Sequence, residues 1–314
     1  QSVDGRVNFS LLVDNFSFDN TRYVHSLLHY PLYRNSSYDV LRCYAPPNRL
    51  GVLYPKLDRQ GVVALADTIV HRIEITAGDD VGNRSVLAFS VVRSEVFPAA
   101  VKPAGIPVVW NKPASYDDGQ MTITLPARVL YESTFLSVLE RPRPKGALSP
   151  VYTLVNDQAP LQTAMTLSLK VDAVPTALYG KLCFVSYDRD STSRTYEGGF
   201  LQSGRMVLST RTYGTYYVVA DTLAPKITPN FRPDASMTGA QRLSITARDD
   251  LSGIKRWAVY IDDAWTLSEH DPKSHTITHF FADARYAEGK THTLRIEAED
   301  NRGNRTVVST TFVW

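Results

Sequence analysis

Residues 300–307 have the sequence D-N-R-G-N-R-T-V, and residues 79–86 have the sequence D-D-V-G-N-R-S-V. Both fit the pattern D-x-x-G-N-R-[ST]-V, and each follows a segment in which apolar residues alternate. Alternation with a period of two places the apolar side chains on one face of a half-buried strand. The alternating residues are Ile73, Ile75 and Ala77 in the first copy and Leu294, Ile296 and Ala298 in the second.

The turn between such strands favours glycine, because glycine adopts a positive φ without strain, and asparagine and aspartate bond to nearby backbone groups. The repeated pattern therefore predicts a β-hairpin near each end of the chain, of the kind that closes an immunoglobulin-like sandwich. The turn residues predicted to be structural are Asp79, Gly82, Asn83, Asp300, Gly303 and Asn304.

Similar alternation recurs throughout the chain. Its 314 residues exceed the length of one typical domain. Alternating segments begin at Met121, Leu167, Leu182, Leu243 and Trp257. We predict an all-β fold of tandem β-sandwich modules, the last of them immunoglobulin-like. The predicted boundaries are residues 1–95, 96–222 and 223–314, with residues 97–113 as a connector between the first two modules.

The first module is predicted to be truncated at its N-terminus. Asp4-Gly5 is a strong hairpin signal, yet almost nothing precedes it. We therefore expect the first half of this hairpin to be missing and the chain to be a piece of a longer protein. A short helix is expected to begin after residues 19–21, whose side chains suit a helix N-terminus.

Charge and cysteine content exclude little but set some expectations. A formal net charge of +2 gives no electrostatic reason to expect a nucleic-acid partner. The longest apolar run falls short of the ~20 residues that span a bilayer. Cys43 and Cys183 lie far apart along the chain, and we expect two buried thiols rather than a disulfide.

One stretch resembles a known family. Residues 13–24, V-D-N-F-S-F-D-N-T-R-Y-V, followed later by Asp79-x-x-Gly82-Asn83, resemble the region after the catalytic domain in lysostaphin-type (LytM-like) zinc endopeptidases secreted by Bacteroidetes. The resemblance continues through residues 200–204, 211–216 and 221–225. It covers most of the chain, but residues 13–24 are its most specific part.

Such peptidases hold zinc with an H-x-x-x-D motif and an H-x-H motif. No two histidines here are separated by a single residue, so the H-x-H motif is absent. The resemblance therefore implies the non-catalytic tail of such an enzyme, with no catalytic or metal-binding residue carried over. Zinc is expected in the missing catalytic domain. The histidines are His25, His29, His71, His270, His275, His279 and His292.

Two histidine pairs have H-x-x-x-H spacing, His25 with His29 and His275 with His279. A helix would place the first pair on one face, as a zinc site requires, but the metalloprotease sequence H-E-x-x-H is absent. The second pair lies in a strand-like segment, where residues four apart are too distant to chelate one ion. We favour packed or surface histidines in both cases.

Two aspartates lie side by side at four places, and calcium bound between β-modules uses such carboxylates. Aspartates that bond to their own turn backbone are much commoner, so we favour that interpretation and expect no metal in this chain. The pairs are Asp79-Asp80, Asp117-Asp118, Asp249-Asp250 and Asp262-Asp263.

Tyrosines cluster at residues 30–44 and 213–217. We favour tyrosines that fill cores and cover sandwich edges; the alternative is that they bind sugars or a partner. Thr68, Ser191 and Thr222 fit the D-[ST]-apolar acceptor that Bacteroidetes use for O-glycosylation.

Two functions follow from these observations. The first is an accessory region of a zinc endopeptidase that acts on peptidoglycan or another peptide, orienting the catalytic domain or contacting wall or partner. The second is an envelope adhesin or carbohydrate-binding protein without a catalytic parent. In either case we expect a secreted or cell-envelope protein, whose partner is peptidoglycan, a glycan or an envelope protein.

Overall fold

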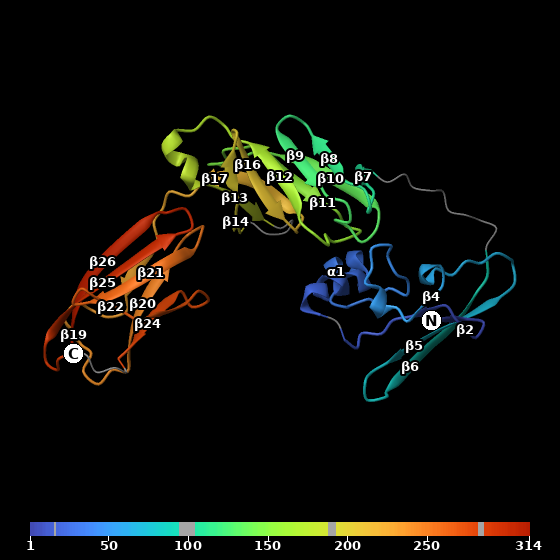
Figure 1. Ribbon diagram of the computed structural model, residues 1–314, viewed down its shortest axis with the longest axis horizontal. Helices are drawn as coiled ribbons and strands as arrows, with labels where there is room; N and C mark the ends of the chain where they lie inside the picture. The colour runs from blue at the N-terminus through green and yellow to red at the C-terminus, as the bar shows by residue number, and fades with distance from the viewer. Residues whose placement is uncertain (16, 94–103, 188–192, 282–285) are drawn as a thin grey trace. The chain divides into compact units, whose positions relative to one another are not determined.

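The computed structural model describes residues 1–15, 17–93, 104–187, 193–281 and 286–314 (Figure 1). The chain is 46% strand and 10% helix, with several separate antiparallel sheets. The predicted all-β fold of tandem β-sandwich modules is confirmed. The chain falls into two compact units, residues 1–140, 152–167 and 209–214 in one and 141–151, 168–208 and 215–314 in the other. The three-module boundaries stay a prediction.

None of the described helices has the length and apolar content needed to cross a membrane.

The N-terminal segment forms two small sheets, with strand orders β2-β1-β5-β6 and β3-β4. Its strands are β1 (Ser2–Val3), β2 (Arg6–Val7), β3 (Phe9–Ser10), β4 (Lys56–Leu57), β5 (His71–Gly78) and β6 (Arg84–Val91). Its helices are the 3₁₀ helices η1 (Phe18–Leu27), η2 (Gly51–Leu53) and η3 (Arg59–Gly61) and the α-helix α1 (Tyr30–Asn35).

The hairpin at Asp4-Gly5 has both of its strands. Asp4 and Gly5 have φ values of 49° and 78°, and Val3 pairs with Arg6 across the turn. The expectation that this hairpin lacks a first strand is therefore wrong, because the two residues of β1 pair both with β2 and with β5. That the first module is truncated stays a prediction. The expected helix is present as η1, which begins at Phe18, slightly earlier than expected.

The middle segment contains two sheets, of orders β14-β13-β17-β11-β10-β7 and β15-β16-β12-β9-β8. The elements are β7 (Ile106–Val108), β8 (Ala114–Asp117), β9 (Met121–Leu125), β10 (Thr134–Arg141), β11 (Val151–Val155), β12 (Met165–Lys170), η4 (Thr176–Lys181), β13 (Leu182–Tyr187), β14 (Thr195–Gly198), β15 (Phe200–Gln202), β16 (Arg205–Thr210) and β17 (Gly214–Ala220).

Two details of this segment differ from expectation. Strand β7 lies inside the stretch expected to be a connector, where it pairs with β10; residues 97–103 of that stretch lie outside the described residues. Strand β13 is buried on both faces, from Leu182 to Ser186. Alternation revealed only one of these faces, because a strand covered on both sides carries an almost continuous apolar run.

The C-terminal segment is a sandwich of two sheets, of orders β18-β20-β24-β23 and β19-β26-β25-β21-β22. The elements are β18 (Lys226–Pro229), β19 (Ala235–Ser236), β20 (Arg242–Arg248), β21 (Ile254–Ile261), β22 (Ala264–Thr266), β23 (Glu269–Asp271), β24 (Thr276–Phe280), β25 (Thr291–Asp300) and β26 (Arg305–Val313). One core contains side chains from both sheets, among them Ile245, Ile277, Val259 and Ile296.

The repeated hairpin lies in two different settings. In the C-terminal copy, β25 and β26 pair from Thr291 to Glu299, and Leu294, Ile296 and Ala298 are all buried. In the N-terminal copy, β5 pairs with β6 in the same way, but only Ile73 is buried. Ile75 is half-buried and Ala77 is exposed. The predicted half-buried strand is therefore complete only in the C-terminal sandwich, where a second sheet covers it.

Both cysteines are free, Cys183 buried in β13 and Cys43 half-buried. Burial raises the pKa of the Cys183 thiol to about 11.

Substitution of Gly303 is expected to destabilise the C-terminal sandwich. Gly303 has a φ of 73°, a conformation that a β-branched residue adopts only with strain. We expect Gly303→Val to lower the free energy of unfolding by more than ~1 kcal/mol, measured by denaturant titration. Gly180→Val is the matched control, because Gly180 is exposed, has no positive φ and has open space around it. Equal losses in the two variants would contradict this explanation.

The pairing of His71 predicts a pH-dependent stability of the N-terminal sheet. Its Nδ1 lies 2.7 Å from Asp4 Oδ2 and its Nε2 lies 2.9 Å from Asp67 Oδ1. The hydrogen bonds that the imidazole donates, first to Asp4 and then to Asp67, raise the pKa of His71 above its usual value. Stability from a raised histidine pKa is fully present below about pH 6.5 and is lost as the pH rises through the folded-state value.

We therefore expect hydrogen-exchange protection of β1 and β5 to fall as the pH rises from about 6.5 towards 8, after correction for intrinsic exchange. In His71→Gln this fall should be absent. A His71→Gln variant with the same pH profile as the wild type would show that the ion pairs contribute nothing.

Candidate functional site

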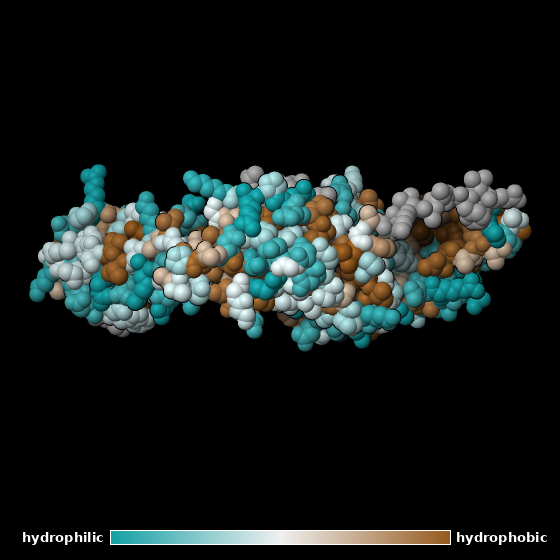
Figure 2. Space-filling view, turned by 90° about the horizontal axis from the view of Figure 1, so that it is seen from above, coloured by the Kyte–Doolittle hydropathy of each residue, from teal (hydrophilic) through white to brown (hydrophobic). Residues whose placement is uncertain are grey.

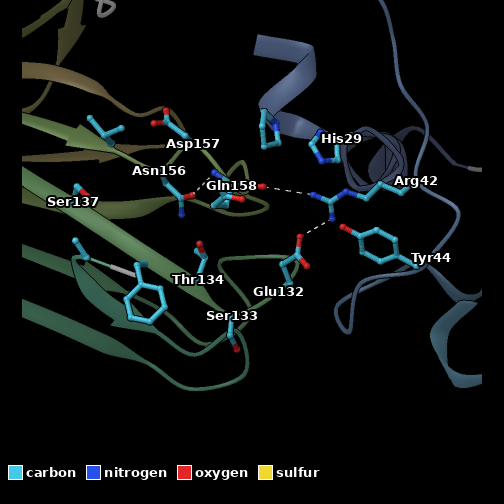
Figure 3. Close-up of a pocket in the computed structure, with 14 residues that line it drawn as sticks. His29, Arg42, Tyr44, Glu132, Ser133, Thr134, Ser137, Asn156, Asp157 and Gln158 are labelled. Carbon is cyan, nitrogen blue, oxygen red and sulfur yellow. Dashed lines mark hydrogen bonds and ion pairs between the residues drawn. The ribbon is translucent and has the colours of Figure 1, made fainter. Parts of the chain in front are cut away.

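A polar cavity of about 530 Å³ lies in the first unit (Figure 3). One side is formed by His29, Arg42 and Tyr44 from the N-terminal segment. The other is formed by Glu132 and Ser133, which precede β10, and by the loop after β11, with Asn156, Asp157 and Gln158. Figure 3 shows that these two groups of side chains face each other across the cavity.

Arg42 is the most buried charged group of this cavity, with 7% of its surface exposed. Its Nη1 lies 2.5 Å from Glu132 Oε1, and its Nη2 donates to the Gln158 carbonyl at 3.5 Å. The guanidinium also lies 5.3 Å from the centroid of the Tyr44 ring. Arg42 Nε is buried and has no hydrogen-bond partner among the described residues.

Hydrogen bonds next to the cavity hold its two walls in place. Asn48, which is 1% exposed, donates from Nδ2 to the carbonyls of Arg128 and Leu130 at 3.1 and 2.9 Å. The Tyr131 hydroxyl donates to the Arg22 carbonyl. The Asn156 carboxamide oxygen accepts the amides of Gln158 and Ala159, which shapes the loop after β11. The cavity is therefore preformed, since its walls are held by buried hydrogen bonds.

The predicted turn residues form one hydrogen-bonding pattern at both sites. Asp300 Oδ1 accepts the amides of Arg302 and Asn304 at 2.7 and 2.9 Å. Its Oδ2 accepts the Asn304 carboxamide at 2.6 Å. Asp79 Oδ1 accepts the amides of Val81 and Asn83 at 3.1 and 2.8 Å, and its Oδ2 accepts the Asn83 carboxamide at 2.6 Å.

These turns are placed differently. Asp79 is exposed, and the hydrogen bond from the Asn83 side chain is the main cause that lowers the pKa of its carboxyl. Asp300 is fully buried, and its turn contacts the preceding segment. Lys181 Nζ donates to the Arg302 carbonyl at 2.8 Å, and Asn304 donates to the Asp221 carbonyl at 3.0 Å. Nothing in the sequence of the two copies distinguishes the buried turn from the exposed one.

The histidine pairs are not brought together as metal sites. His25 is exposed at η1, whereas His29 caps α1, where its Nδ1 accepts the Leu32 amide at 3.4 Å. The two do not share one helix. His279 is buried between the Leu267 carbonyl, at 2.8 Å, and the Tyr286 hydroxyl, at 3.3 Å.

The acidic pairs mostly bond to their own turns, as Asp117 does with the Gly119 amide and Asp249 with the Leu251 and Gly253 amides. Asp262 accepts the amide of the more distant Thr293.

The tyrosines and glycosylation candidates are placed as follows. Tyr216 and Tyr217 are buried, whereas Tyr33 and Tyr38 are 46% and 76% exposed. Thr68 and Thr222 are exposed, and Ser191 lies outside the described residues.

The Arg42–Glu132 pair predicts a strong coupling of free energies. Removal of one partner from a buried ion pair leaves a desolvated charge and costs about 3–5 kcal/mol, whereas replacement of both partners costs much less. We expect Glu132→Leu to lower the free energy of unfolding by ~3 kcal/mol and Arg42→Met/Glu132→Leu to restore most of the loss. A double-mutant cycle in denaturant measures this coupling. Additive losses would show that the pair does not interact.

Residues 107–221 match the model of the Zu5-like domain, which covers the two sheets of the middle segment. No curated protein matches the chain.

Proposed function

We propose that this chain is the non-catalytic accessory region of a secreted lysostaphin-type zinc endopeptidase that acts on peptidoglycan or another peptide. Two observations support the proposal. Residues 13–24 resemble the segment that follows the catalytic domain in such enzymes. The N-terminal sheet exposes an apolar face, and this second observation carries the proposal.

The apolar face is formed by cross-strand neighbours of β5 and β6. Ile73 pairs with Phe89 and Ile75 with Leu87, so their four side chains lie on one face of the sheet. Leu87 is 59% and Phe89 is 42% exposed. On the face that Figure 2 shows, apolar residues are exposed between polar ones in several places. Adjacent exposed apolar groups of this kind mark docking surfaces, because their burial is favourable.

The proposed occupant of this face is the catalytic domain. Strand β1 begins at Ser2 and lies in the same sheet, next to β5. A domain joined ahead of Gln1 would therefore be attached beside the apolar face. Docking there would orient the catalytic domain without any catalytic residue from this chain.

Matched substitutions in the intact protein test the docking. Burial of a leucine contributes about 1.5–3 kcal/mol, so Leu87→Ser is expected to weaken docking about tenfold or more. Val86→Ser is the control, because Val86 is 58% exposed on the opposite face of the same strand. Calorimetry should show the catalytic domain unfolding as a separate transition in Leu87→Ser only, and peptidoglycan hydrolysis should fall in that variant.

Equal behaviour of the two variants would rule out docking at this face. The reading frame ahead of Gln1 gives a simpler test of the parent enzyme. It should encode an H-x-x-x-D motif and an H-x-H motif, and a signal peptide directly before Gln1 would contradict the proposal.

The isolated chain should carry no stoichiometric zinc and should not cleave peptidoglycan. Hydrolysis in the suspected family depends on a metal that lowers the pKa of a bound water molecule. One equivalent of zinc by elemental analysis, or release of muropeptides that a chelator abolishes, would contradict this expectation.

The cavity at Arg42 favours a second function, an envelope adhesin or carbohydrate-binding protein. Tyr44 supplies an aromatic ring and Arg42 Nε a buried donor, both of which suit a sugar or peptide oxygen. Binding of peptidoglycan fragments to the chain, lost in Tyr44→Ala, would support this function. Without such binding the cavity is only part of the packing between segments.

A further inference from the structure

Three carboxylates from separate segments meet in the second unit. Asp221 directly follows β17, Asp249 directly follows β20, and Asp300 ends β25. One oxygen from each lies within 4.8 Å of the others. Asp221 is 3% exposed and Asp300 is fully buried, while Asp249 is half-buried. Of these three residues, only Asp249 belongs to one of the aspartate pairs for which the sequence offers calcium binding as an alternative.

The turn hydrogen bonds leave two of these carboxylates partly unsatisfied. Asp249 Oδ2 accepts the amides of Leu251 and Gly253 at 3.0 and 2.8 Å. Its Oδ1 is buried and has no hydrogen-bond partner among the described residues, and the same is true of Asp221 Oδ2. A buried carboxylate oxygen without a donor is costly and therefore points to a missing partner.

A neutral oxygen at the same place is an independent indication. The Ser252 side chain is 4% exposed, and its hydroxyl has no hydrogen-bond partner among the described residues. Ser252 lies in the turn that Asp249 closes, and its carbonyl accepts the side-chain amide of Asn301, the neighbour of Asp300, at 2.7 Å. Its hydroxyl is therefore a buried neutral oxygen in the same turn as one of the carboxylates, and calcium sites commonly combine ligands of such different chemistry.

Among the described residues, no side-chain cation forms an ion pair with any of the three carboxylates. Lys181 Nζ donates to the Arg302 carbonyl, and Arg302 Nη2 donates to the Gly199 carbonyl at 3.2 Å.

We propose that Asp221, Asp249, Asp300 and Ser252 form a Ca²⁺ site. Ca²⁺ takes oxygen ligands at about 2.3–2.6 Å, so ligands on opposite sides of the ion lie about 4.6–5.2 Å apart. The carboxylate oxygens lie within 4.8 Å of one another, close enough to share one such ion. The ion would tie the segment after β17 to two turns of the C-terminal sandwich, independently of the proposed function.

This proposal stands against the sequence-based expectation of no metal in this chain, and direct binding tests it. Titration calorimetry of the full chain with CaCl₂ should show one equivalent bound, with a dissociation constant of about 10⁻⁴–10⁻³ M or tighter, as in extracellular modules. Saturating Ca²⁺ should raise the Tm of the C-terminal sandwich by about 4 °C or more, because ligand binds only the folded state. Absence of binding at 5 mM (about five times the weakest value expected) would overturn the proposal.

Substitutions locate the ion. Asp221→Asn should abolish the Ca²⁺-dependent rise in Tm, and in EDTA it should raise the Tm, because it removes one of three repelling charges. Asp250→Asn is the matched control, since Asp250 is exposed in the same turn as Asp249 and should keep the full response.

A Ca²⁺ response that persists in Asp221→Asn, or that Asp250→Asn also removes, would overturn the site. A Tm lowered equally with and without Ca²⁺ in Asp221→Asn would show a purely structural aspartate.

Discussion

An aspartate that accepts the amides of its own turn is the constraint on which much of this structure depends. Asp79, Asp249 and Asp300 each bind amides two and four residues ahead. Turn amides have no partners in a sheet, and a carboxylate satisfies them without help from another segment. The strands on either side of the Asp300 turn, β25 and β26, can therefore pair along almost their whole length, and β25 supplies much of the C-terminal core.

The local sequence pattern predicts those structural features, strand faces and turns, that depend only on residues close together in the chain. The buried faces of β9, β20 and β25 follow from alternation, as Ile123, Ile245 and Ile296 show with no exposed surface. The turns follow from the positions of aspartate, glycine and asparagine. The pattern fails where partners are distant: Arg42 and Glu132 are 90 residues apart, and neither shows in its own neighbourhood that it will be paired.

Burial of the turns is likewise a tertiary property. The two copies of the repeated turn differ little in sequence, yet Asp79 is exposed and Asp300 is fully buried. The linker residue Asp221 has the sequence context of an extended connector, but it is 3% exposed and accepts Asn304 through its carbonyl. The candidate sites arise from such meetings of distant segments, so they could not be predicted from the sequence.

The self-capped hairpin also bears on how chains of this kind are assembled and altered. Because its hydrogen bonds close within five residues, the same hairpin exists both in solvent at Asp79 and against another segment at Asp300. Such a hairpin can be duplicated, or moved from one β-module to another, without changes in the residues around it. Recombination at such turns would then generate new module orders while each sandwich keeps its own core, and only the few groups at the joint, such as Asn304 and Lys181, would have to adapt.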